Sequence, residues 1–248
     1  RQAIALDRRT GGEDSQIYQL GTLAMNHQNY EESKRAFDYI ISKGEANPFF
    51  NQAFLQNIHA SYVKYIQENI MDKSGGTLIA GQFEKGLQLF GYSSATLNLI
   101  NEYSHLLAFY LNDPDSAIAV LEKGLKIPKL KPEETGILKT ALADIYVYSG
   151  DPWEAILLYS QVIDDNKNNE LSDEVKLKKA KLGYYMGNFN WAKAQLDILK
   201  GSTSKFTAND AMELSMLIGN NLNLDTTEIP LQMFARADLL FFRNKDSL

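Results

Sequence analysis

A helix–turn–helix pattern that recurs along the chain is the feature that most restricts the possible fold. Residues 136–163 contain two apolar-periodic segments that flank a turn at residues 149–152. Their three- and four-residue spacing is typical of amphipathic helices. Ala143 and Ala155 stand where two helices would cross most closely, since a larger side chain would force the axes apart. The segment therefore predicts an antiparallel helical hairpin.

The same pattern occurs several times at a nearly constant spacing. Turns at Asn112, Gly150 and Gly187 lie 38 and 37 residues apart, and a further copy covers residues 18–37, where Ser33 replaces the alanine. A sustained period of about 20–50 residues indicates a solenoid or a related repeat architecture. The sequence therefore predicts an all-α fold, an α-solenoid of antiparallel helix pairs.

The pattern also predicts how the chain is divided. We expect a single array over residues 1–248, with about six helix–turn–helix units, cut within a repeat at both ends. Residues 1–7 are expected to end a helix, and residues 244–246 to form a turn. The unit at residues 48–90 diverges, with a predicted break at residues 73–76, and a second interruption is expected at residues 219–227.

Composition narrows the classes of function. The net charge is −6, from 25 basic and 31 acidic residues, whereas a general nucleic-acid binder needs a basic stripe. A run of about 18 apolar residues, which a membrane span requires, is absent from the sequence. The chain has no cysteine, so disulfides, thiolate nucleophiles and cysteine-ligated zinc are excluded. We therefore expect neither nucleic-acid binding nor direct membrane insertion.

No motif predicts a catalytic, cofactor or metal site. His27, His59 and His105 have no histidine neighbour at the four-residue spacing of a helical metal site. The segment that starts at Asp164 is similar to the opening of a calcium loop, but Val175 occupies the twelfth position, where a bidentate carboxylate is required. That segment is expected to be a solvated polar linker, and we expect a non-enzymatic chain without cofactors.

The central copy resembles the tetratricopeptide repeat (TPR). Its first helix has a leucine, a small residue and an aromatic one turn later, and its second helix has an alanine followed by an aromatic. The residues concerned are Leu142, Ala143, Tyr146, Ala155 and Tyr159. The resemblance implies that the predicted fold is a right-handed α-solenoid. Residues 104–112, 153–162 and 180–211 further resemble a long TPR protein found widely in Bacteroidota. That resemblance implies a periplasmic location, with the cytoplasm as the alternative.

The TPR resemblance implies a partner-binding surface, because the first helix of each unit lines the concave face of such arrays. Tyr148 and Tyr185 could equally fill gaps between stacked helices, whereas Tyr146 and Tyr184 are expected in the core. Trp153 and Trp191, at the starts of second helices, are expected to pack between units. The positions carried over to the concave face are Phe109, Tyr110, Thr140, Asp144, Val147, Tyr148, Leu177, Lys181, Tyr184 and Tyr185.

Among these positions, Thr140, Asp144, Leu177 and Lys181 stand where carboxylate-clamp arrays place lysine and asparagine, so a co-chaperone of that type is not expected. The leading hypothesis is a scaffold that binds a peptide or protein segment on the concave face through summed burial. The alternative is a structural spacer without a ligand in this segment. An enzyme is a third possibility, because one fold can host many activities.

Overall fold

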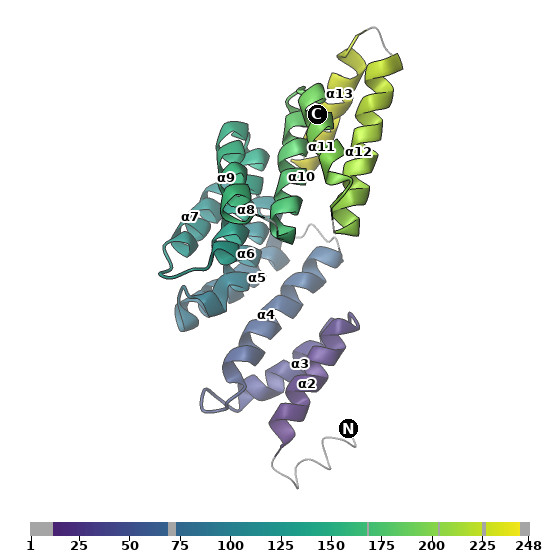
Figure 1. Ribbon diagram of the computed structural model, residues 1–248. Coiled ribbons are helices and arrows are strands. Elements are labelled where there is room, and N and C mark those ends of the chain that lie inside the picture. Colours follow the sequence, from purple (N-terminus) through teal and green to yellow (C-terminus); the bar gives the residue numbers. More distant parts are fainter. Residues whose placement is uncertain (1–11, 69–72, 168, 203, 225–226, 244–248) are drawn as a thin grey trace. The chain divides into compact units, whose positions relative to one another are not determined.

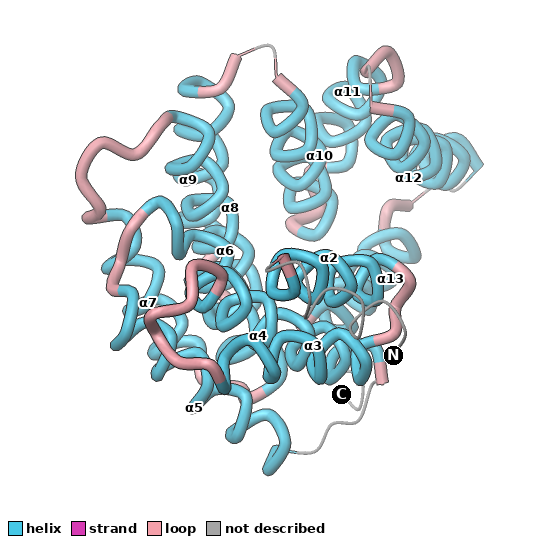
Figure 2. Tube along the Cα trace, turned by 90° about the horizontal axis from the view of Figure 1, so that it is seen from below, coloured by secondary structure: helices cyan, strands magenta, loops and turns pink. Residues whose placement is uncertain are grey.

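The structure is a computed structural model that describes residues 12–68, 73–167, 169–202, 204–224 and 227–243. Within these residues it contains helices, turns and loops and no strand (Figure 2). The all-α class predicted from the sequence is confirmed. The helix end expected at residues 1–7 and the turn expected at residues 244–246 lie outside the described residues.

The chain forms two compact units, Arg1–Leu106 and Leu107–Leu248. In unit 1 consecutive helices pack on one another in antiparallel pairs (Figure 1). Its core contains Phe37 and Ile40, both fully buried. The elements of unit 1 are α2 (Glu13–Asn26), α3 (Tyr30–Ser42), α4 (Phe50–Gln67), α5 (Lys73–Phe90), η1 (Ser94–Thr96) and α6 (Leu97–His105).

In unit 2 the pairs α8·α9 and α10·α11 are joined by packing of α9 on α10 and of α11 on α12 (Figure 1). The first helices α8, α10 and α12 are neighbours in that order, which is the stacking of an α-solenoid. The elements are η2 (Leu106–Tyr110, across the unit boundary), α7 (Pro114–Leu125), α8 (Pro132–Ser149), α9 (Pro152–Asp165), α10 (Glu170–Tyr185), α11 (Phe189–Leu199), α12 (Lys205–Leu224) and α13 (Ile229–Phe242).

The turns of unit 2 fall where the sequence places them. Gly150 ends α8 with φ of +109°, a left-handed conformation that favours glycine. Pro152 then starts α9 at its first turn, where the backbone N–H that proline lacks would have no acceptor within the helix. Gly187 adopts the same left-handed conformation after α10, with φ of +80°. These local signals explain why the hairpins were predictable.

Small residues set the distance between paired helices. Ala143 of α8 and Ala155 of α9 are both fully buried within one core cluster, as predicted. Ala117 of α7 and Ala192 of α11, the equivalent residues of their copies, are also fully buried. Because the helices approach at these side chains, larger residues there would separate the axes.

One predicted break is wrong, and the other begins later than predicted. Residues 73–76 form the first turn of α5 rather than a loop, because the buried face of that helix, including Phe83, extends toward its N-terminus. The interruption predicted at residues 219–227 starts later, because α12 continues to Leu224, and residues 225–226 lie outside the described residues. Gly219 lies inside α12 and is buried against α11, where an added Cβ would lie 3.0 Å from Cε of Lys193. Tertiary packing thus outweighs a helix penalty of about 1 kcal/mol for glycine.

Two further predictions on side-chain environment need correction. Trp153 is 72% exposed rather than packed between units. Trp191 is 42% exposed, and its ring lies 2.6 Å from the position that a Cβ on Gly183 of its own pair would take. Asn166, in the predicted solvated linker, is buried and its Nδ2 donates to the carbonyls of Val162 and Pro132. This amide links the end of α9 to the start of α8.

Candidate partner-binding face

The structure brings the eight predicted partner-binding residues into unit 2, on η2, α8 and α10. They lie on the first helices of adjacent pairs, as the repeat pattern requires. We use the name first-helix face for the surface that these residues form, on which the helix α13 packs. The eight are Phe109, Tyr110, Thr140, Asp144, Tyr148, Leu177, Lys181 and Tyr185.

Aromatic rings from three of these segments meet on this face. The ring of Phe109 contacts that of Tyr148 edge-on, with centroids 4.9 Å apart. Phe242, from α13, contacts Phe109 at 5.9 Å and Tyr185 at 6.5 Å. These are favourable separations for tilted and edge-to-face pairs. Phe109 of η2 and Tyr185 of α10 therefore meet at one residue of α13, and Tyr148 of α8 packs on Phe109.

Two of the predicted residues are buried. The Thr140 hydroxyl donates to the carbonyl of Gly136 at 2.8 Å, a bond within α8. The Tyr148 hydroxyl donates to Oδ1 of Asn112 at 3.0 Å, and burial raises the pKa of Tyr148. With 7% and 6% of their surfaces exposed, Thr140 and Tyr148 shape the face but offer a partner little contact area.

Asp144 connects three helices instead of facing solvent freely. Its carboxylate accepts hydrogen bonds from the Tyr159 hydroxyl of α9 and from Nζ of Lys178 on α10 at 2.7 Å. Burial raises the pKa of Tyr159, and the carboxylate raises it further. Burial alone would lower the pKa of Lys178, but the carboxylates of Asp144 and Glu174 together raise it above its ordinary value, so the ammonium stays charged. Asp144 therefore has a structural role in joining adjacent pairs.

Replacement of Asp144 by alanine should destabilise unit 2 by about 2–3 kcal/mol, because two donors on two helices lose a charged acceptor. Urea unfolding followed by tryptophan fluorescence would measure this, since Trp153 and Trp191 both lie in unit 2. Asp165→Ala is the matched control, because Asp165 makes an exposed ion pair with Lys139 at 3.4 Å, and such pairs contribute less than about 1 kcal/mol. Equal losses in the two variants would contradict the structural role.

The remaining residues provide the accessible part of the face. Lys181 is exposed, and its Nζ lies 5.9 Å above the ring of Tyr185. Leu177, Tyr185 and Tyr110 are partly exposed. Burial, followed by the nearby carboxylate of Asp238 on α13, raises the pKa of Tyr185. The face therefore combines an aromatic and aliphatic surface with one exposed cation.

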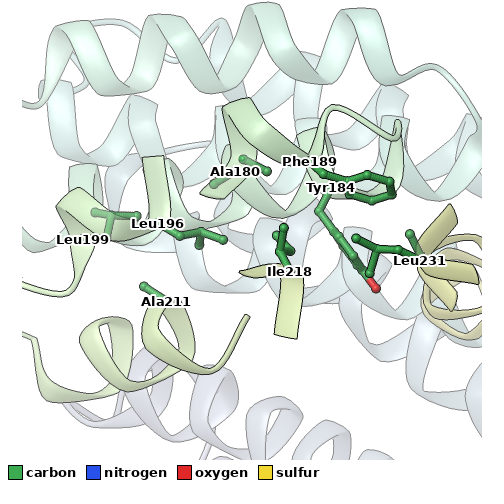
Figure 3. Packing of buried hydrophobic residues seen from close by; sticks show 10 residues of the cluster. Ala180, Tyr184, Phe189, Leu196, Leu199, Ala211, Ile218 and Leu231 are labelled. Atoms are coloured by element: carbon green, nitrogen blue, oxygen red, sulfur yellow. The ribbon is translucent and has the colours of Figure 1, made fainter. Parts of the chain in front are cut away.

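α13 is the occupant of the face, which the sequence did not indicate. In the structure Leu231 and Ala235 join the core cluster of α10, α11 and α12, and Tyr184 points toward Leu231 (Figure 3). The spacing of Leu231, Ala235, Leu239 and Phe242 indicates one apolar helical face, but nothing in it specifies which surface that face covers.

Two histidines of unit 1 make contacts between helices. Among the described residues, no group of three or more histidine, aspartate or glutamate side chains has the arrangement of one. In unit 1, Nδ1 of His59 lies 2.6 Å from Oε1 of Glu102, and this contact raises the pKa of His59 despite its partial burial. Nδ1 of His105 lies 2.8 Å from the Tyr62 hydroxyl. Both histidines thus link α4 to α6.

Comparisons with known proteins identify the type of fold. No protein-family model matches the sequence, and no curated protein is significantly similar to it. Among solved structures, PilF of Pseudomonas aeruginosa is 15% identical and similar over 94% of this chain and 96% of its own, with a TM-score of 0.59. A TPR protein of Parabacteroides merdae is 8% identical over 94% of this chain and 87% of its own, with a TM-score of 0.56. The fold is therefore of the TPR type, an α-solenoid.

Proposed function

We propose that this chain is a non-enzymatic scaffold that binds a peptide or protein segment on the first-helix face of unit 2. TPR-type folds provide extended surfaces for protein interaction. The observation that carries the proposal is the convergence of Phe109, Tyr148 and Tyr185 with a helix already seated against them. Rigid aromatic residues with apolar surroundings are enriched at the centres of interfaces.

The charge of the chain favours a protein partner over nucleic acid. Its net charge of −6 would repel a phosphate backbone. No helix in the described part of the chain is both long and apolar enough to cross a bilayer. We place the protein in the periplasm on the resemblance to TPR proteins of Bacteroidota, and fractionation of the producing organism would test this placement.

The proposal is tested by charge reversal at Lys181, which is exposed on the face. Wild-type protein and Lys181→Glu would be used to capture partners from the organism that makes it. A partner on this face should be retained at least about tenfold less by the variant, because a rim charge changes both attraction and encounter rate. Lys123→Glu, on the exposed side of α7, is the matched control and should retain the partner fully.

A structural spacer is the second candidate. It is favoured by the burial of Thr140 and Tyr148 and by the coverage of Tyr185 and Phe109 by α13. A spacer predicts that no specific partner is retained by the wild type or by either variant. That result would favour the spacer, whereas a partner retained equally by the wild type and both variants would contradict the proposed binding face without supporting the spacer.

A further inference from the structure

α13 occupies the first-helix face in the manner of a bound helix. It follows α12 in sequence but packs on α10 as well as on α12. Its inward side places Leu231 and Ala235 against the α10–α12 cluster, and Leu239 and Phe242 against the α8–α10 cluster. The contacts therefore extend along the face from one pair to the next, which is the path that a bound segment would follow.

Polar contacts fix the direction and register of α13 on this face. The Tyr184 hydroxyl donates to Oδ2 of Asp238 at 3.2 Å. Nε of Arg243 donates to the carbonyl of Val147 at 2.8 Å. That carbonyl belongs to the last turn of α8, where carbonyls lack intrahelical donors and the helix dipole favours a cation. The basic end of α13 therefore meets the C-terminal end of α8.

The inward residues of α13 define a recognition pattern. Relative to the first anchor, they stand at positions i, i+4, i+7, i+8, i+11 and i+12, which lie on one side of a helix. The pattern combines aliphatic anchors, an acid that accepts from tyrosine, an aromatic and a terminal arginine. The six residues are Leu231, Ala235, Asp238, Leu239, Phe242 and Arg243.

α13 has few buried residues to hold it in place. Only Leu231 and Ala235 are buried among its residues, whereas α10 buries six residues, from Ser172 to Tyr184. On the outer side Met233 is 69% exposed and Phe241 is 74% exposed. Elements with few buried contacts open at the lowest free-energy cost. α13 is therefore the helix of unit 2 most readily exchanged for another.

We propose that α13 is an internal occupant of the first-helix face, and that the partner is an amphipathic helix with the same inward pattern that replaces it. The inference rests on the proposed function and specifies its partner as a helix rather than an extended peptide. Helix recognition of this kind depends on anchors at i, i+4, i+7 and similar positions on one side.

Because it is attached to the chain, α13 masks the face from helices in solution. A tethered segment has an effective concentration of about 1 mM when its linker is short. If the same helix binds in solution with a dissociation constant of about 10 μM, the tethered copy would weaken apparent binding about 100-fold. Weakening the tethered copy should therefore strengthen binding of a free helix.

The test uses the full chain and a fluorescein-labelled peptide with the sequence of residues 227–243, with binding measured by anisotropy. In the chain variant Leu239→Ala/Phe242→Ala the tethered helix loses two anchors. We expect this variant to bind the peptide at least about tenfold more tightly than the wild-type chain does. A second chain variant, Arg243→Glu, removes the contact to Val147 and should act in the same direction.

Adjacent phenylalanines provide the control. A Phe242→Ala peptide should bind the Leu239→Ala/Phe242→Ala chain at least about tenfold more weakly, whereas a Phe241→Ala peptide should bind like the original, because Phe241 points outward and is 74% exposed. Circular dichroism would confirm that each chain is folded. Equal binding by the wild-type and both variant chains, or equal binding by all peptides, would overturn the inference.

The two proposals fail separately. A partner that depends on Lys181 but is not displaced by the peptide from residues 227–243 would retain the proposed function and overturn the helical partner. Peptide binding with the expected dependence on Phe242, but without any partner sensitive to Lys181→Glu, would retain the internal helix site and contradict the scaffold function. The peptide measurement needs no knowledge of the partner's identity.

Discussion

Tyr184→Ala should lower the free energy of unfolding of unit 2 by about 3–5 kcal/mol, which is typical when a large buried aromatic is truncated. Tyr184 is fully buried and is among the largest of the fully buried side chains. Its ring contacts Phe189 at 5.8 Å and Tyr185 at 5.7 Å, and it also packs in the cluster with Leu231 of α13. The substitution therefore leaves a cavity where α10, α11 and α13 meet.

Urea unfolding followed by tryptophan fluorescence measures this effect in the correct unit, because Trp153 and Trp191 both lie in unit 2. Tyr184→Phe separates the ring from the hydroxyl and should cost only about 1 kcal/mol, the net value of one hydrogen bond. Trp153→Ala, an aromatic substitution at a site 72% exposed, should change stability by less than about 0.5 kcal/mol. A loss for Tyr184→Ala no greater than that for Tyr184→Phe would contradict the cavity argument.

The part of the fold that could be predicted depends on residues close together in sequence. Each signal for the central hairpin is a single residue. A helix end is indicated by Gly150, a helix start by Pro152 and a close helix crossing by Ala155. Their recurrence at a constant period predicts stacking of pairs. The divergent segment that contains α4 and α5 lacks such signals, and there the predicted break at residues 73–76 was wrong.

The candidate face was only partly predictable for a physical reason. Helical periodicity gives the side of a helix on which a residue lies, but not which element covers that side. Nothing near Tyr148 indicates its bond to Asn112, and nothing near Phe242 indicates its contacts with Phe109 and Tyr185. The roles of these residues depend on contacts between segments far apart in the chain. The sequence therefore predicted the elements that form the face but missed its occupant.

Asp144 illustrates the same limit for a charged residue. Its position on a first helix indicates a solvent-facing or partner-binding role, and the TPR resemblance implies the latter. In the structure its acceptors are satisfied by Tyr159 and Lys178 from two other helices. A partly buried carboxylate is retained when donors compensate for its lost hydration. Those donors are 15 and 34 residues away, beyond the reach of any local pattern.

In unit 1 the largest expected effect is that of Phe37→Ala, at about 3–5 kcal/mol. Phe37 is fully buried in a cluster with Ile17 and Ile40, and its ring lies 5.7 Å from that of Tyr18. Hydrogen exchange of the amides in α2 and α3 would assign the loss to unit 1, whose sequence contains no tryptophan. Leu23→Ala on the exposed side of α2, where Leu23 is 53% exposed, should have little effect.

Gly21 should be energetically coupled to Phe37. A Cβ on Gly21 would lie 2.7 Å from Cε1 of Phe37, so Gly21→Ala should cost about 1–3 kcal/mol through overpacking, less about 1 kcal/mol for better helix propensity. In a Phe37→Leu background the cost should fall by at least about 0.5 kcal/mol, or change sign, because the ring is gone. An additive double-mutant cycle would contradict this coupling. It would show that the ring of Phe37 does not require glycine at position 21, and that the close approach of α2 and α3 does not depend on this glycine.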